Sequence, residues 1–365
     1  MDIAIRRMYK PKGIEILIRK TAIWWRATQV GVLAVACSLG VAGIAQATPA
    51  KTGGTPSDEV HNSSYVESVE KVNDRQLIVN VYAASMNRTI PIQVITAADN
   101  SEPRPILYLL NGAGGGEDSA TWQRQTDVVD FFADKNVNVA TPVGGRLSYY
   151  TDWEKDDPQA GRNQWSTFLG TELPPLLNKE LNSNGKQAIS AISMSGTSVL
   201  NLAIEHPGFY SSVAAYSGCA QTSDPLGQAF VRTTTEWIGG IEDITNMWGP
   251  FDGPGWVEHD PLVNAEKLRG TPIYMSTGNG LPGIPNDTFL NPRLSDGRAY
   301  TENQIIVGGV IEAATNLCTS NMAKRLYELK IPAVVDFEPV GTHSWGYWQD
   351  QLHKSWPFIA GSLGV

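Results

Sequence analysis

The sequence predicts an α/β fold in which a mainly parallel β-sheet is flanked by helices. Short apolar runs rich in Val, Ile and Tyr alternate with longer amphipathic stretches along most of the chain. The first two runs, 76–84 and 90–98, follow each other directly, which is typical of antiparallel strands, whereas helical stretches separate several of the later runs, as in a parallel sheet. With 365 residues and 42% hydrophobic content, the chain is long enough to bury a sizeable core.

The predicted elements follow in order along the chain. The eight predicted strands are short apolar runs, at 76–84, 90–98, 105–112, 136–143, 187–193, 211–218, 272–278 and 333–340. The predicted helices are longer stretches, at 119–135, 165–181, 195–210 and 313–330. Residues 226–262 are less regular and rich in Trp, Gly and Pro, and an insertion at this place often forms a lid or a wall over the functional site.

The N-terminal segment predicts a secretory signal peptide. Residues 1–26 hold seven basic and two acidic side chains, and an apolar stretch, 30–47, ends in Ala45-Gln46-Ala47. The alternative is a membrane anchor, for which the stretch is short and rich in Gly and Ala. We expect translation to start at Met1 or Met8, cleavage near Ala47, and export to the cell envelope or the medium.

We expect a linker over 48–62 and one catalytic domain over 63–365. Because residues 1–47 hold seven basic and two acidic side chains, their removal shifts the formal net charge from −9 to −14, which disfavours nucleic acid and anionic membranes as partners. Two cysteines remain, Cys219 and Cys318, and in an exported protein they predict one disulfide, with two buried free thiols as the alternative. No His or Cys near them has metal-ligand spacing, so we expect neither a metal nor another cofactor.

Ser193 lies on the turn between the predicted strand 187–193 and the helix that follows it. A serine nucleophile exposed on such a turn usually has glycine two residues before and after it, because the strained backbone leaves no room for larger side chains. Ala191 and Ser195 stand at these positions and are small. The alternative is that these serines only cap the helix. We predict that Ser193 is the nucleophile.

A serine nucleophile needs a base and an acid. In folds that use this turn, the chain order is serine, acid, histidine, with the histidine after the last strand. His343 has this position, since it follows the predicted strand 333–340. Asp287, in the loop after the strand 272–278, and Glu312 both lie between Ser193 and His343, and the spacing alone does not decide between them.

The glycine-rich loop 109–118, "LLNGAGGGED", directly follows a predicted buried strand. Glycines let backbone N–H groups turn towards a developing oxyanion. We expect one donor from Ala113 in this loop and the other from Met194, the residue after the nucleophile. The loop lacks the Lys-Ser/Thr ending of a phosphate-binding loop.

Seven segments, in this order, closely resemble the secreted mycoloyltransferases of mycolic-acid bacteria, meaning the antigen-85 complex and its corynebacterial relatives. They are "YLLNG", "PVGGRLSYYTDW", "WSTFLGTELP", "AISMSG", "NMWGP", "GNG" and "GTHSWGYW", and the likeness covers about residues 62–360. The resemblance implies an α/β-hydrolase fold and a Ser-Glu-His triad. It favours Glu312 as the acid over Asp287, and the cysteine pair looks like the corynebacterial branch.

The first loop departs from the mycobacterial pattern. Those members have an acidic residue, Gly, a bulky apolar residue and Arg where trehalose is held, whereas this chain has Asn111-Gly112-Ala113-Gly114. We therefore expect Asn111 and Gly114 at the sugar site, without the acidic charge and the guanidinium. We expect three tryptophans to line an apolar site or to stack on a sugar, namely Trp248, Trp345 and Trp348. The alternative is that they are structural residues of the core.

The function implied by the resemblance is acyl transfer. Ser193 would take a mycolic acyl chain from trehalose monomycolate, and a hydroxyl group of trehalose monomycolate, arabinogalactan or an outer-membrane protein would receive it. One alternative is a secreted carboxylesterase that uses the same triad with water as acceptor. Another is an envelope-binding protein that keeps the fold without activity.

Overall fold

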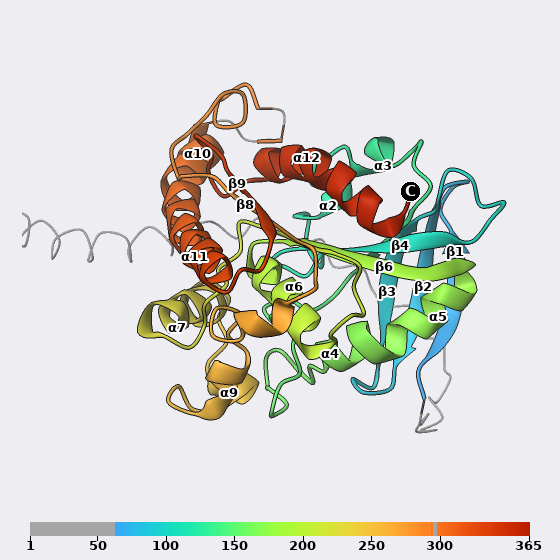
Figure 1. Ribbon diagram of the computed structural model, residues 1–365, viewed down its shortest axis with the longest axis horizontal. Helices are drawn as coiled ribbons and strands as arrows, with labels where there is room; N and C mark the ends of the chain where they lie inside the picture. The colour runs from blue at the N-terminus through green and yellow to red at the C-terminus, as the bar shows by residue number, and fades with distance from the viewer. Residues whose placement is uncertain (1–62, 292, 295–297) are drawn as a thin grey trace, which may run out of the picture. The chain divides into compact units, whose positions relative to one another are not determined.

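The structure of the protein is a computed structural model that describes residues 63–365, with the exception of 292 and 295–297. The predicted signal peptide, 1–47, and the predicted linker, 48–62, lie outside the described residues. Within the described part, one sheet has the strand order β1-β2-β3-β5-β4-β6-β7-β8-β9 (Figure 1). The strands are β1 (Tyr65–Lys71), β2 (Gln76–Ala83), β3 (Arg88–Ile95), β4 (Arg104–Leu110), β5 (Asn138–Pro142), β6 (Ser183–Ile192), β7 (Val213–Tyr216), β8 (Ile273–Thr277) and β9 (Ala333–Phe337).

The sheet changes from antiparallel to parallel along its width. β1, β2, β3 and β5 pair antiparallel in that order. From β5 onward, through β4, β6, β7, β8 and β9, every pairing is parallel. The predicted fold class, with antiparallel strands first and βα alternation afterwards, is confirmed. Parallel strands put their carboxyl ends at one edge of the sheet, and Ser193, the predicted nucleophile, follows β6 at this edge.

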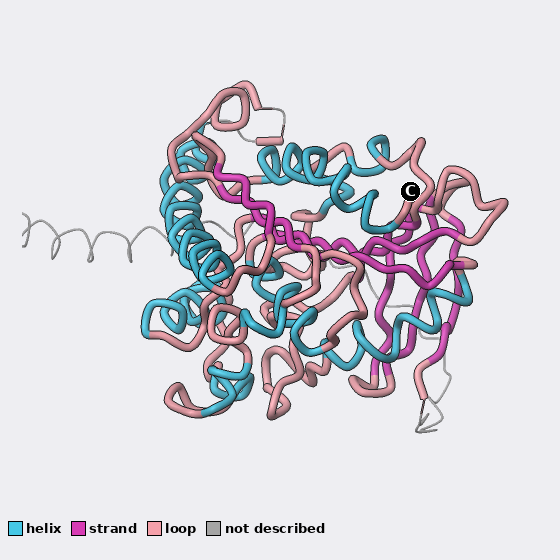
Figure 2. The backbone as a smooth tube through the Cα atoms, viewed as in Figure 1, coloured by secondary structure: helices cyan, strands magenta, loops and turns pink. Residues whose placement is uncertain are grey.

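Helices cover both faces of the sheet (Figures 1 and 2). On one face lie α2 (Trp122–Gln125), α3 (Val128–Phe131) and α12 (Trp345–Leu363), and on the other lie α4 (Trp165–Thr167), η1 (Phe168–Glu172), α5 (Leu173–Glu180) and α6 (Met194–Glu205). The side chains of β4 alternate accordingly: Ile106, Tyr108 and Leu110 join the core on the α6 face, and Leu107 and Leu109 join the core on the α12 face.

The remaining helices lie in the second half of the chain. The predicted irregular stretch 226–262 overlaps three short helices and one π-helical turn, joined by loops. These elements, with those that follow them, are α7 (Pro225–Arg232), η2 (Thr233–Ile238), α8 (Thr245–Trp248), α9 (Pro254–Glu258), η3 (Ala265–Leu268), α10 (Arg298–Asn303), η4 (Gln304–Gly308) and α11 (Gly309–Glu328). Over the described residues, no helix combines the length and the apolar character that a membrane span needs.

Among the elements that differ from the sequence-based expectations, three have a clear physical reason. β1 was not expected, because five of its seven residues are exposed and it carries little apolar pattern. The expected helix 119–135 is divided into α2 and α3, since Thr126 ends α2 in an extended conformation. The expected helix 165–181 contains the π-helical turn η1. Pro174 and Pro175 have no N–H group to bond the carbonyls four residues earlier, so a regular α-helix cannot pass this point.

Candidate active site

Ser193 lies on the turn between β6 and α6, at the carboxyl edge of the sheet. Its backbone has φ 56° and ψ −130°, a strained conformation for a residue other than glycine. The turn is held because the Ser193 N–H donates to the carbonyl of Tyr216 at 2.9 Å and the Gly196 N–H donates to the carbonyl of Ser193 at 2.9 Å. Backbone strain of this kind is typical of an exposed nucleophile.

The turn has no glycine at either of the two usual positions, and the structure explains why it forms nevertheless. Ala191 is fully buried, and the Ser195 hydroxyl, also fully buried, donates to the carbonyl of Asn111. The close approach between backbones falls one residue later, at Gly196. A Cβ atom there would lie 3.0 Å from Cα of Gly218. Small residues are therefore still required, but at shifted positions.

His343 follows β9 and lies between Ser193 and Glu312. Its Nε2 is 2.8 Å from Oγ of Ser193, and its Nδ1 is 2.8 Å from Oε2 of Glu312. Because an ionised carboxylate only accepts hydrogen bonds, Nδ1 carries the proton and Nε2 is left to accept from the serine hydroxyl. The imidazole side chain is 10% exposed, and its backbone N–H donates to the carbonyl of Gly308 at 3.1 Å.

Glu312 lies in the first turn of α11 and is 1% exposed. While Oε2 faces His343, Oε1 accepts hydrogen bonds from the Gly278 N–H at 2.6 Å, the Ser217 hydroxyl at 2.8 Å and the Thr277 hydroxyl at 3.1 Å. A buried carboxylate without such donors would be strongly disfavoured. The donors thus hold the carboxylate in place and leave one oxygen for the imidazole.

Asp287 lies near the same histidine loop but does not contact the imidazole. Its Oδ1 accepts from the Thr342 hydroxyl and from Nε2 of Gln304, both at 2.6 Å. Its Oδ2 accepts from the Tyr347 hydroxyl at 2.7 Å and from the Gly283 N–H at 2.8 Å. Each oxygen thus accepts two hydrogen bonds. Through them Asp287 joins its own loop to η4, to the histidine loop and to α12.

Of the two expected oxyanion donors, Met194 is the residue after Ser193, and Ala113 follows Gly112 in the glycine-rich loop. The loop before Ala113 approaches the nucleophile closely, since a Cβ atom on Gly112 would lie 3.4 Å from Cβ of Ser193. The Ala113 carbonyl accepts from the Leu147 N–H at 2.9 Å, which fixes the orientation of the loop. An oxyanion hole requires two N–H groups directed at the same oxygen, and this role stays a prediction for Ala113 and Met194.

Asn111 and Gly114, the residues expected at the sugar site, lie in the same loop. Asn111 is fully buried, and its Oδ1 accepts from the Trp122 N–H at 3.1 Å, so the side chain holds the loop against α2. Gly114 packs against the Asp118 carboxylate, because a Cβ atom there would lie 2.6 Å from Oδ2.

The three tryptophans have different environments. Trp248 is 1% exposed; its ring stacks on His259 with centroids 5.0 Å apart, and no face of it is open to a sugar. Trp348 is also buried, and its Nε1 donates to the Ser217 hydroxyl at 3.0 Å while its ring meets the His343 ring edge-on at 4.9 Å. Trp345 is half-buried and packs edge-on against Trp348 at 5.1 Å.

The insertion contacts the segment beside the expected oxyanion loop at Gly239. The Arg146 guanidinium donates to the carbonyl of Gly239 at 3.0 Å, and a Cβ atom on Gly239 would lie 2.3 Å from Cδ1 of Leu147. Leu147 in turn bonds Ala113, as described above. Part of the insertion is therefore a neighbour of the expected oxyanion loop, whereas its Trp248 and Trp256 belong to the core.

Cys219 and Cys318 form a disulfide, which confirms the predicted pairing. Cys219 follows Ser217 in the loop after β7, and Cys318 lies on α11, the helix of Glu312. The crosslink therefore joins the two segments whose side chains meet at the carboxylate. Ser217 and Thr277, which donate to Glu312, were not identified from the sequence, because single hydroxyl residues after or at the end of a strand have no distinctive pattern.

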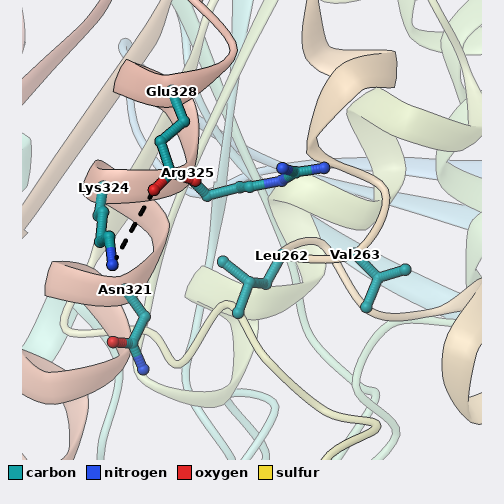
Figure 3. Close-up of a pocket in the computed structure, with 6 residues that line it drawn as sticks. All are labelled: Leu262, Val263, Asn321, Lys324, Arg325 and Glu328. Atoms are coloured by element: carbon teal, nitrogen blue, oxygen red, sulfur yellow. Dashed lines mark ion pairs between the residues drawn. The ribbon is translucent and has the colours of Figure 1, made fainter.

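A separate hollow lies away from the triad, towards the C-terminal end of α11 (Figure 3). Its volume is about 480 Å³, and it is lined by Leu262, Val263, Asn321, Lys324, Arg325 and Glu328. Lys324 and Glu328 form an exposed ion pair at 3.9 Å. None of these residues bonds a triad member. The described residues hold no group of three or more His, Cys, Asp or Glu side chains suited to a metal ion.

Comparisons with known proteins show the family to which the chain belongs. Residues 83–359 match the family model described as "Putative esterase". The diacylglycerol acyltransferase/mycolyltransferase Ag85A of Mycobacterium leprae is 32% identical over 79% of this chain and 83% of its own length. Ag85B of Mycobacterium intracellulare is 29% identical over 96% of this chain and 97% of its own length.

Solved structures agree on the fold. Mycobacterium tuberculosis MPT51 superposes with a TM-score of 0.62 at 25% identity, covering 77% of this chain and 96% of its own. An S-formylglutathione hydrolase from Agrobacterium tumefaciens, at 13% identity and a TM-score of 0.55, covers 82% of this chain and 99% of its own, and shares the fold alone. This chain is a member of the Ag85-type acyltransferase/mycolyltransferase family, and its fold is that of the α/β-hydrolases.

Proposed function

We propose that the protein is an exported acyltransferase that moves a mycolic (corynomycolic) acyl chain from trehalose monomycolate to a hydroxyl group of the cell envelope. The observation that carries the proposal is the continuous hydrogen-bonded series Ser193–His343–Glu312 in a member of this family. In the proposed assignment Ser193 is the nucleophile, His343 the general base and acid, and Glu312 the acid that orients the imidazole.

The first half-reaction releases trehalose. As Oγ of Ser193 attacks the ester carbonyl of the donor, its proton passes to Nε2 of His343. The N–H groups of Ala113 and Met194 stabilise the negative charge on the carbonyl oxygen. When the tetrahedral intermediate collapses, the bond to the sugar oxygen breaks and His343 returns the proton to that oxygen, which leaves an acyl-enzyme on Ser193.

The second half-reaction forms the new ester. His343 takes the proton of an acceptor hydroxyl, the acceptor oxygen attacks the acyl carbonyl, and Ser193 leaves with the proton restored to it. The candidate acceptors are a second trehalose monomycolate, arabinogalactan and a serine of an envelope protein. An acyltransferase must favour these hydroxyls over water. The buried histidine, 10% exposed, supports limited access of water to the base.

A competition experiment tests the acceptor. The purified protein is incubated with trehalose monomycolate, and trehalose, arabinan and a serine-containing porin peptide are offered at equal concentration. Mass spectrometry shows which of them gains the acyl group. We expect more acyl on an acceptor than free acid, and neither product from the Ser193→Ala variant. Free acid as the main product with every acceptor in excess would favour the carboxylesterase alternative instead.

Labelling with a fluorophosphonate probe tests whether the site is active at all. We expect the probe to modify the protein once, and the Ser193→Ala variant to remain unlabelled. An unreactive parent protein would support an envelope-binding role without catalysis. The proposed export is tested separately by N-terminal sequencing of the protein from the culture medium, where we expect it to start at Thr48.

A further inference from the structure

Six large apolar side chains beside the candidate site are exposed. They are Leu281 (60% exposed), Ile284 (90%), Phe289 (60%), Leu290 (91%), Ile306 (65%) and Val310 (69%), and we call them the apolar rim. Single exposed apolar residues are ordinary on a protein surface, but a group of them at one site marks an interaction surface. The first four lie in the loop after β8, and the other two lie in η4 and in the first turn of α11.

The two segments of the rim contact each other. Nε2 of Gln304 donates to the carbonyl of Asn286 at 3.0 Å and to Oδ1 of Asp287 at 2.6 Å. A Cβ atom on Gly280 would lie 2.4 Å from the carbonyl oxygen of Gly309. The loop after β8 is thus packed against η4 and the start of α11, and Figure 1 shows these orange segments together at one end of the molecule's sheet.

The rim also lies directly next to the triad. The Gly280 N–H donates to the carbonyl of Gly341 and the Gly341 N–H donates to the carbonyl of Leu281, both at 2.8 Å, and Gly341 is two residues from His343. Val310, in the first turn of α11, points to the other side of that helix from Glu312, since side chains two residues apart on a helix do not face each other. The loop part of the rim is therefore joined by backbone hydrogen bonds to the loop that carries His343.

The charge of the rim indicates what covers it. The stretches 278–291 and 303–311 contain one charged residue, Asp287, and it is buried, although 18% of the chain is charged and the net charge is −9. Between the two stretches the chain has two basic and two acidic residues, Arg293, Arg298, Asp296 and Glu302, which add no net positive charge to attract anionic headgroups. An apolar surface without net positive charge on an acidic protein fits a lipid surface with neutral or sugar headgroups.

We propose that the apolar rim docks the protein on a neutral lipid surface and inserts Ile284 and Leu290 among the acyl chains. The proposal rests on the proposed function in one respect: the acyl donor is an amphiphile that reaches Ser193 from such a surface. Transfer of apolar side chains from water into lipid drives the binding, so its strength depends on these side chains and little on salt.

Vesicle flotation tests the docking without any catalysis. The protein, exported from its host with its own N-terminus and purified from the medium, carries Ser193→Ala and is mixed with phosphatidylcholine vesicles. We expect the added Ile284→Ser/Leu290→Ser pair to lower the partition coefficient at least tenfold (about 1.4 kcal/mol). The matched control is Tyr327→Ser, which removes a residue 84% exposed near the far end of α11, and which should leave partition unchanged.

Further measurements separate the outcomes. Partition of the protein should change less than twofold between low and high salt, and should fall when phosphatidylglycerol replaces a third of the phosphatidylcholine, because the protein is acidic. Equal partition of parent and double variant would overturn the proposal. A second result would also overturn the proposal: the parent is a dimer, the double variant is a monomer, and the two partition equally. The rim would then be a contact between two copies of the protein. If the double variant is poorly folded by circular dichroism, Val310→Ser replaces it.

Activity of the Ser193-containing protein distinguishes this proposal from the proposed function. The double variant should hydrolyse a soluble short-chain ester at the parental rate, but should use trehalose monomycolate dispersed in vesicles at least tenfold more slowly. Equal rates of parent and variant on the dispersed donor would contradict the docking role. If the parent protein transferred no acyl group but still partitioned through the rim, the function would be wrong and the docking surface would stand.

Discussion

Two buried carboxylates lie close to the same histidine loop and have different partners. Glu312, 1% exposed, has three donors on Oε1 and the imidazole of His343 on Oε2. Asp287, 7% exposed, has two donors on each oxygen, and none of the four belongs to the imidazole. Both carboxylates have hydrogen-bond partners on each oxygen, but only Glu312 bonds the imidazole of His343.

This difference shows that burial does not identify a catalytic acid. The loop after β8 is where the general fold pattern places the acid, and Asp287 is there, next to Thr342. However, its oxygens hold the loop, η4 and α12 together, whereas the donors on Glu312 come from one side and leave the other side free. The distribution of donors over the two oxygens is the observation that favours Glu312 as the acid in the proposed assignment.

Of the variants that test this comparison, Glu312→Gln is expected to lower kcat the most. The amide has only one oxygen. If that oxygen accepts from the three donors of Oε1, the NH₂ group faces Nδ1 and cannot accept its hydrogen bond, so the tautomer and orientation of the imidazole are no longer fixed. We expect kcat to fall by about 10³–10⁴-fold, as when the acid of a serine triad is made an amide. Steady-state kinetics with a soluble ester measures it, with thermal unfolding as the check that the variant folds. Activity within tenfold of the parent would mean that Glu312 is not the acid.

Removal of one donor from Glu312 should have an intermediate effect. Ser217→Ala takes away the hydroxyl that donates to Oε1 and accepts from Trp348, while Thr277 and Gly278 remain. We expect kcat to fall about tenfold, with KM nearly unchanged, because the substrate does not contact this hydroxyl. The matched control is Ser212→Ala, which removes an equally buried hydroxyl bonded only to Ser362, and whose kcat should stay at the parental value.

Asp287→Asn should affect stability more than catalysis. Each carboxylate oxygen of Asp287 accepts two hydrogen bonds, and an NH₂ group in place of one oxygen can accept neither. Two of the four hydrogen bonds that join the loop to its neighbours are therefore lost. We expect Tm to fall by roughly 5 °C while kcat at a temperature well below Tm stays within about tenfold of the parent. Calorimetry and kinetics on the same sample measure both. A loss of activity as large as that of Glu312→Gln, without unfolding, would reverse the two roles.

A third carboxylate, Glu205 at the end of α6, should matter least for activity. It accepts from the Ser166 hydroxyl and lies 3.7 Å from His259, and burial raises its pKa above the usual value. The folded protein therefore holds this proton more tightly than the unfolded chain. The stability that the proton contributes is present below the usual glutamate pKa and is lost as pH rises through the raised one.

The Glu205→Gln variant has no such proton to lose. We expect the difference in Tm between variant and parent to shift in favour of the variant by a few degrees between about pH 4 and pH 7, with kcat unchanged. Thermal unfolding across this range measures the shift. A difference independent of pH would mean that Glu205 does not titrate differently in the folded protein.

The sequence predicted most of this sheet because its central strands are continuous apolar runs, and it missed β1 because an edge strand with five exposed residues has no such run. Chain order predicted Ser193 and His343, whose side chains the structure brings to 2.8 Å. It did not separate Glu312 from Asp287, because that choice depends on donors from β7 and β8, which lie far away in the sequence. Trp248 illustrates the same limit: its buried ring packs against residues of the insertion and of the segment 149–151.

The most direct test of the whole account is the mass of the Ser193 peptide during turnover. The protein is mixed with trehalose monomycolate, quenched in acid within one turnover, digested and analysed by mass spectrometry. We predict an ester of the donor's acyl group on Ser193, present in the parent, decaying when acceptor is added, and absent from Ser193→Ala. Product that forms while Ser193 remains unmodified, or an acyl group carried on another residue, would contradict the account.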